Sequence, residues 1–130
     1  MDEVAEEIRF LTRGEETEHR AGDLIFAQGD AVGEGGVFHL VSGRVRLERL
    51  RDDGSPLVDF DVEAGDFFGA CSTYGSPTRV FRARALEDCR LYRWTRKDFD
   101  FILGVYQEAA RAVIQSMSRR LRAANHLGGA

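Results

Sequence analysis

The feature that most constrains the fold is a change in the periodicity of the apolar residues near Trp94. From Glu18 to Trp94, turn-forming residues separate short apolar runs at intervals of roughly 8 to 12 residues, which is typical of an all-β sandwich or roll. From Thr95 to Asn125 the apolar residues recur at helical spacing, with Gly104 as the expected break. The sequence therefore predicts a β unit followed by C-terminal helices.

One central run shows the alternation expected of a strand with one buried face. Val45 and Leu47 are expected to point into the core. Arg44, Arg46 and Glu48 alternate with them and are expected to point into solvent. This pattern indicates an antiparallel sheet that covers a core on one side only.

The length of 130 residues fits a single domain with three parts. Residues 1–17 are predicted to form an N-terminal helical segment, because the first apolar residues recur at helical spacing. Residues 18–94 form the predicted β unit, and residues 95–125 the C-terminal helices. Thr95, with Asp98 three residues later, resembles the capping box that starts many helices.

The composition argues against most cofactor chemistry. The chain has only two cysteines, no Cys-x-x-Cys pair, and three histidines that lack ligand spacing. A structural zinc site or a four-thiolate iron–sulfur cluster within one chain, and hence a bound metal, is therefore not expected. We find no catalytic triad, paired carboxylates or phosphate-binding loop, and therefore do not expect an enzyme. The acidic N-terminus and the absence of a long apolar stretch predict a cytoplasmic protein with no membrane contact.

The two cysteines are both predicted to be structural. Cys89 lies in an apolar run and is expected in the core. For Cys71 we favour an unreactive, buried thiol, with a reactive thiol sensor near a helix N-terminus as the alternative. Rapid and selective labelling of Cys71 at neutral pH would indicate a redox sensor or an enzyme.

Charge is unevenly distributed along the chain. Residues 79–97 hold seven basic residues and only two acidic ones, whereas residues 1–34 are strongly acidic. Such a short basic segment favours a local anion site over a DNA-binding surface. We interpret Arg82 and Arg84 within it as solvated residues of a strand face.

The last predicted helix carries an apolar stripe that needs a partner. Two hypotheses are open: the stripe packs against the β unit, or it forms the seam of a homodimer. The near-heptad spacing over about four turns favours the homodimer. The stripe consists of Tyr106, Ala110, Val113, Met117 and Ala124, is widened by Ile114 and Leu121, and is interrupted by Arg120.

Three stretches together resemble the cyclic nucleotide-binding domain of the cyclic-AMP receptor and related Crp/Fnr-type regulators. They are Gly-Asp-Leu-Ile-Phe-Ala-Gln-Gly-Asp at residues 22–30, Phe-His-Leu-Val-Ser-Gly-Arg-Val-Arg-Leu at 38–47, and Gly-Asp-Phe-Phe-Gly at 65–69, which continues through Arg79 to residues 84–91. The resemblance covers nearly the whole chain. It implies a mainly β fold with flanking helices, a double-stranded β-roll (jelly roll) followed by a long C-terminal helix.

The resemblance also implies where a ligand would bind, and this sequence departs from the family pattern there. Arg79 matches the arginine that pairs with the phosphate, and a guanidinium suits that contact. Ala70 replaces the glutamate that holds the ribose hydroxyl, Val80 replaces a hydroxyl residue, and Phe81 replaces a small one. The implied ligand-binding residues are Phe68, Gly69, Ala70, Cys71, Arg79, Val80, Phe81 and, on the long helix, Asn125.

The resemblance implies a regulatory ligand-binding and dimerisation module with a degenerate phosphate-binding cassette at residues 68–81. One alternative is a binding-incompetent scaffold for protein partners, with Val80 and Phe81 filling the pocket. Another is the N-terminal sensor fragment of a Crp/Fnr-type transcription regulator. In such regulators a DNA-binding domain follows the long helix, whereas only five residues follow Asn125 here, so direct DNA binding by this chain is not expected.

No firmly bound cofactor is expected, and a cyclic nucleotide or another small anion is expected to bind weakly. Loss of the glutamate and the hydroxyl should cost roughly 2.5 to 4 kcal/mol. At about 1.4 kcal/mol per tenfold change, a micromolar ligand would weaken to roughly 0.1 to 1 mM. Isothermal titration calorimetry with cyclic AMP checks this, and a dissociation constant below about 10 μM would contradict it.

Overall fold

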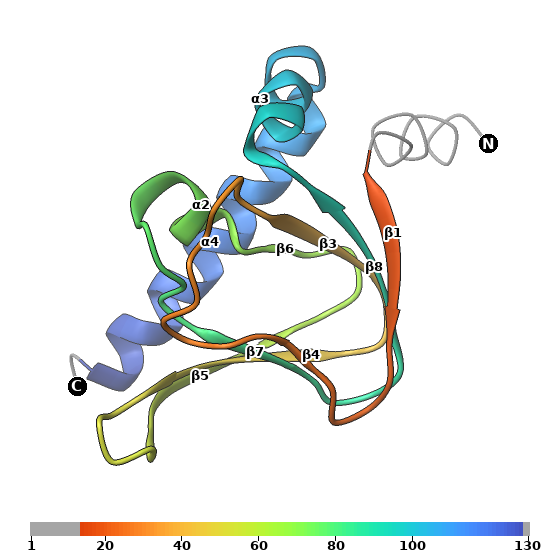
Figure 1. Cartoon of the computed structure of the whole chain (residues 1–130). Helices are drawn as coiled ribbons and strands as arrows, with labels where there is room; N and C mark the ends of the chain where they lie inside the picture. The colour runs from red at the N-terminus through yellow and green to blue at the C-terminus, as the bar shows by residue number, and fades with distance from the viewer. Residues whose placement is uncertain (1–13, 129–130) are drawn as a thin grey trace.

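Two antiparallel four-stranded sheets face each other and form a roll, with the helices along one side (Figure 1). A computed structural model describes residues 14–128, with side chains as far as Arg122. The strand order is β1-β8-β3-β6 in the first sheet and β2-β7-β4-β5 in the second. The elements are β1 (Glu15–His19), β2 (Leu24–Phe26), β3 (Val37–Ser42), β4 (Val45–Leu50), β5 (Pro56–Val62), β6 (Phe67–Phe68), α2 (Ala70–Gly75), β7 (Arg82–Ala85), β8 (Cys89–Trp94), α3 (Arg96–Val105) and α4 (Gln107–Gly128).

The predicted β-roll followed by a long C-terminal helix is confirmed. The predicted N-terminal boundary is wrong by a few residues, because residues 15–17 belong to β1 and not to a helical segment. These residues pair with β8, about 75 positions away, and local periodicity does not show such a partner. The helix expected before them lies outside the described residues.

The interior of the roll is one of two apolar cores. Val45 and Leu47 of β4 point into it as predicted, opposite the small residues Ala85 and Ala83 of β7. Phe38, Phe68 and Cys89 add to the same core, which confirms the prediction for Cys89. Burial raises the pKa of the Cys89 thiol, so this cysteine stays protonated at neutral pH.

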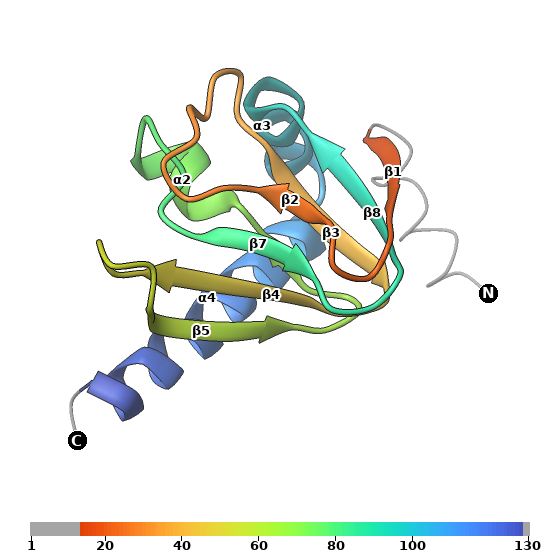
Figure 2. The ribbon, with the colours of Figure 1, turned by 60° about the horizontal axis from the view of Figure 1, so that its bottom comes forward.

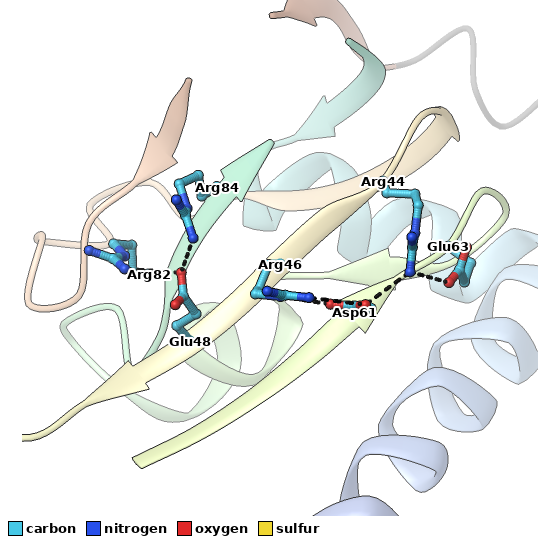
Figure 3. Close-up of polar contacts among 7 residues, drawn as sticks. All are labelled: Arg44, Arg46, Glu48, Asp61, Glu63, Arg82 and Arg84. Atoms are coloured by element: carbon cyan, nitrogen blue, oxygen red, sulfur yellow. Dashed lines mark hydrogen bonds and ion pairs between the residues drawn. The ribbon is translucent and has the colours of Figure 1, made fainter. Parts of the chain in front are cut away.

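The outer face of the second sheet carries a network of ion pairs (Figure 3). Glu48 is only 5% exposed, although alternation placed it on the solvated face. The reason is that Arg82 and Arg84 of β7 lie over it, with guanidinium nitrogens 3.0 and 3.3 Å from its Oε1. Both arginines are therefore partly covered ion-pair partners and not freely solvated residues.

The second core lies between the first sheet and the helices. Val37 and Trp94 on the sheet pack with Phe99 of α3 and Val113 of α4. Strand β3 is thus buried on both faces, because Phe38 on the same strand points into the roll. The helices are consequently part of the structural core of the described chain.

The helical region begins as predicted and breaks later than predicted. The Asp98 backbone N–H donates a hydrogen bond of 3.2 Å to Thr95 Oγ1, which caps α3. The break falls at Tyr106 instead of Gly104, since Tyr106 is extended and packs against the second core. In the described part of the chain, no helix combines the length and apolar character needed to cross a membrane.

Candidate ligand-binding site

A cavity of about 510 Å³ lies between the inner face of the second sheet, α2 and α4. Figure 2 shows this sheet in front of α4, with α2 near the start of β7. The volume lies within the range of small-molecule sites, about 300 to 1,000 Å³. The lining residues are Phe26, Leu47, Phe60, Gly69, Cys71, Ser72, Phe81, Ile114, Met117, Ser118, Arg120 and Leu121.

One end of the cavity is the turn from β6 into α2. Gly69 makes this turn with a φ of +87°, and a Cβ there would lie 2.5 Å from the Gly36 carbonyl oxygen. Only glycine fits this position without displacing backbone. Thr73 of α2 also contacts Gly36: its Oγ1 lies 3.0 Å from both the backbone N and the carbonyl O of that glycine.

Arg79 forms hydrogen bonds with the same two glycines, Gly36 and Gly69. Its Nη1 donates to the Gly69 carbonyl and its Nη2 to the Gly36 carbonyl, each over 3.1 Å. The guanidinium carbon lies 4.4 Å from the centre of the Phe26 ring. Within the described chain, no carboxylate oxygen lies within 4.0 Å of the guanidinium nitrogens. Burial lowers the pKa of this arginine, and repulsion from Arg93 adds to the effect.

Arg79 is thus a buried residue, 6% exposed, that lies outside the cavity lining. A phosphate clamp would instead need its guanidinium directed at the ligand. In this structure two of its N–H groups donate to backbone carbonyls, and the side chain does not line the cavity.

Phe81 forms a wall of the cavity and does not fill it. Its ring points into the roll and meets the Phe60 ring edge-on, with the centroids 5.7 Å apart. Val80, its neighbour, lies outside the lining, and its backbone N–H donates a 3.0 Å hydrogen bond to Ser72 Oγ. The hypothesis that Val80 and Phe81 close the pocket does not match this geometry.

The other residues implied by the resemblance are spread over different environments. Phe68 is fully buried and stacks on Phe38 at 5.0 Å. Ala70 packs in the second core. Cys71 is exposed and lines the cavity, so the prediction of a buried thiol was wrong; α2 is short and lies at the cavity mouth. Asn125 lies on α4, beyond the described side chains.

Arg120 of α4 lines the cavity, and sequence reasoning missed it. Its guanidinium donates a hydrogen bond to the Phe67 carbonyl oxygen, and no described carboxylate oxygen lies within 4.0 Å of it. Burial lowers the pKa of Arg120, while the nearby Asp66 acts in the opposite direction. The available signal was a single arginine within an apolar helical stripe, which the sequence analysis treated only as an interruption.

The basic segment 79–97 does not converge on one anion site, contrary to the expectation from its charge. Arg82 and Arg84 bind Glu48, whereas Arg90 binds Glu16 and Arg93 donates to the Gly35 carbonyl. Arg82 and Arg84 share a partner because alternate side chains of β7 point to one face, whereas Arg90 and Arg93 point to opposite faces of β8 and meet different partners.

The described chain is thus a β-roll closed by helices, with a short helix between β6 and β7. Residues 16–106 match the family described as "Cyclic nucleotide-binding domain", and the chain belongs to this family. A search of curated protein sequences gives no significant match. Proteins of this family type act as regulators, in agreement with the resemblance of the sequence.

Several solved structures have the same fold. The regulator CLP of Xanthomonas campestris is 21% identical, with a TM-score of 0.85 over 95% of this chain and 61% of its own. The catabolite activator protein of Thermus thermophilus is 28% identical, with a TM-score of 0.77 over 93% of this chain and 56% of its own. The N-terminal domain of a Streptomyces coelicolor transcriptional regulator is 27% identical, with a TM-score of 0.65 over 98% and 85%. The chain thus spans about three fifths of the first two proteins.

We predict that Arg79→Met lowers the free energy of unfolding by about 2 kcal/mol, because the Gly36 and Gly69 carbonyls each lose a hydrogen bond from a charged donor. Arg49→Met is the matched control, since Arg49 is exposed on β4 and should change stability by less than about 0.5 kcal/mol. Urea unfolding followed by circular dichroism measures both. Equal stability of the two variants would show that Arg79 does not hold the cassette.

Proposed function

We propose that this protein is a regulatory ligand-binding and dimerisation module, in which a small molecule in the cavity changes how α4 pairs with a second copy. The observation that carries this proposal is the composition of the cavity walls. Gly69, Cys71 and Ser72 of the cassette segment form one wall, and α4 forms the wall facing it. A ligand there touches the cassette and the helix at the same time, and can favour one position of the helix over another.

Support for pairing comes from the two faces of α4. Ala109 and Val113 are buried against the sheet. Ile114, Met117 and Leu121, at three- and four-residue spacing, are 63%, 40% and 64% exposed. Exposed apolar residues in such a row fit the seam between two helices of a symmetric dimer. The same three residues line the cavity, so pairing and ligand binding share one surface.

The proposed output is control of transcription, with the chain as a sensor unit. The Thermus thermophilus and Streptomyces coelicolor relatives are described as a catabolite activator protein and a transcriptional regulator. The similarity at 28% and 27% identity favours the same kind of output here, with this chain as the part that senses the ligand.

The ligand part of the proposal is tested by filling the cavity. Ser118→Trp adds a large ring on the cavity side of α4, and Gln115→Trp adds it at an exposed position outside the lining. A thermal-shift screen against cyclic AMP, cyclic GMP, cyclic dinucleotides and other small anions should give at least one ligand. At 100 times its dissociation constant, this ligand adds about 2.7 kcal/mol of stability, a shift of several degrees.

We expect Ser118→Trp to abolish this shift and Gln115→Trp to keep it. A shift that survives in Ser118→Trp would place the ligand elsewhere. If no compound in the panel shifts the melting temperature of the wild-type protein, the ligand role is contradicted and a scaffold for protein partners is favoured.

The dimerisation part predicts that Leu121→Glu converts a dimer into a monomer, because two carboxylates would meet in an apolar seam. Gln115→Glu introduces the same charge at an exposed α4 position and should leave the dimer intact. Light scattering coupled to size-exclusion chromatography measures the mass. A monomeric wild-type protein, or a Leu121→Glu dimer as stable as wild type, would refute the pairing through α4.

A further inference from the structure

The cavity wall consists mostly of carbon. Aromatic rings come from β2, from β5 and from the residue before β7, and aliphatic and thioether groups come from β4 and α4. Such a wall favours a ligand with a large apolar part, since burying apolar surface is the main source of binding energy. These residues are Phe26, Leu47, Phe60, Phe81, Ile114, Met117 and Leu121.

The polar groups of the wall do not suit a sugar. Among the described residues, no aspartate or glutamate lines the cavity. Ser72 Oγ already accepts a hydrogen bond from the Val80 backbone N–H. Ala70, where the family carries its glutamate, is buried in the second core. A ribose hydroxyl would therefore lose its water without gaining a charged acceptor.

Among the described residues, one cation lines the wall. Arg120 lines the cavity, and one of its N–H groups binds the Phe67 carbonyl oxygen. Neighbouring Arg119 instead pairs with Asp66, which leaves Arg120 without a carboxylate partner within 4.0 Å in the described part of the chain. Because a guanidinium has five N–H donors in a planar fork, the others are suited to a carboxylate.

We propose that the cavity binds a small amphipathic monoanion, with a carboxylate on Arg120 and an aliphatic or aromatic body against Phe60, Phe81 and Met117. This inference rests on the proposed ligand-binding function and specifies its ligand class. The carboxylate supplies a counter-charge for Arg120, and the apolar part of the ligand covers the apolar wall. The volume of about 510 Å³ accommodates a medium-chain fatty acid or a small aromatic acid.

The test compares decanoate with decan-1-ol, which share the apolar chain and differ in the charged head. Calorimetry on the wild-type protein should show decanoate binding at least about tenfold tighter, the effect of one hydrogen-bonded ion pair. In Arg120→Met the preference should disappear, with decanol binding changed by less than about threefold. Arg119→Met is the matched control, because Arg119 is the next residue on α4 and lies outside this wall.

Each result is decisive. Equal binding of decanoate and decanol to the wild-type protein overturns the inference without requiring any variant to fold, and so does an unchanged preference in Arg120→Met. Tight binding of cyclic AMP with no binding of decanoate overturns the inference but leaves the proposed function standing. If Ser118→Trp binds decanoate as well as wild type does, the cavity is not the site and both proposals fail.

Discussion

The described part of the fold depends on a positive charge held in an aromatic setting. The Arg79 guanidinium lies against the Phe26 ring and joins two carbonyls, Gly36 at the start of β3 and Gly69 at the start of α2. A buried charge is costly unless it is hydrogen bonded, and here dipoles and a ring face provide the compensation. Thr73 donates to the same two carbonyls, from its hydroxyl to Gly36 and from its backbone N–H to Gly69, so Arg79 and α2 are joined to one pair of acceptors. Arg79 thus fixes the cassette against the first sheet, and the cavity mouth takes its shape from that attachment.

The two faces of α4 show how one helix can serve the core and the site. An apolar stripe wider than a strict heptad seam covers too much of the helix surface for one partner. Val113 turns to the sheet, whereas Ile114 and Leu121 remain exposed at the cavity. From the sequence, packing against the roll and pairing with a second helix were alternatives for this stripe. In the structure some residues of the stripe pack against the first sheet, and other residues stay exposed and available for pairing.

The parts that sequence could predict are those governed by neighbours along the chain. Alternation identified Val45 and Leu47 as core residues, and the spacing of Thr95 and Asp98 located the start of α3. The errors concern residues whose environment comes from distant segments. Glu48 is buried by arginines 34 and 36 positions away, and Arg120 reaches a carbonyl 53 positions away. Periodicity gives the face on which a residue lies, but it does not reveal what covers that face.

The two arginines near the cassette show why motif position alone does not assign a ligand contact. Arg79 matches the family's phosphate-binding arginine in the sequence motif, yet two of its donors bind carbonyls, the Phe26 ring lies over it, and it does not line the cavity. Arg120 matches no cassette motif, yet it borders the cavity with donors to spare. Ala70 stands in the second core where the family has an acid, and Phe81 stands where the family has a small residue and adds an aromatic ring to the cavity wall. Under the ligand class proposed above, both departures weaken the binding of a sugar phosphate and favour an apolar anion.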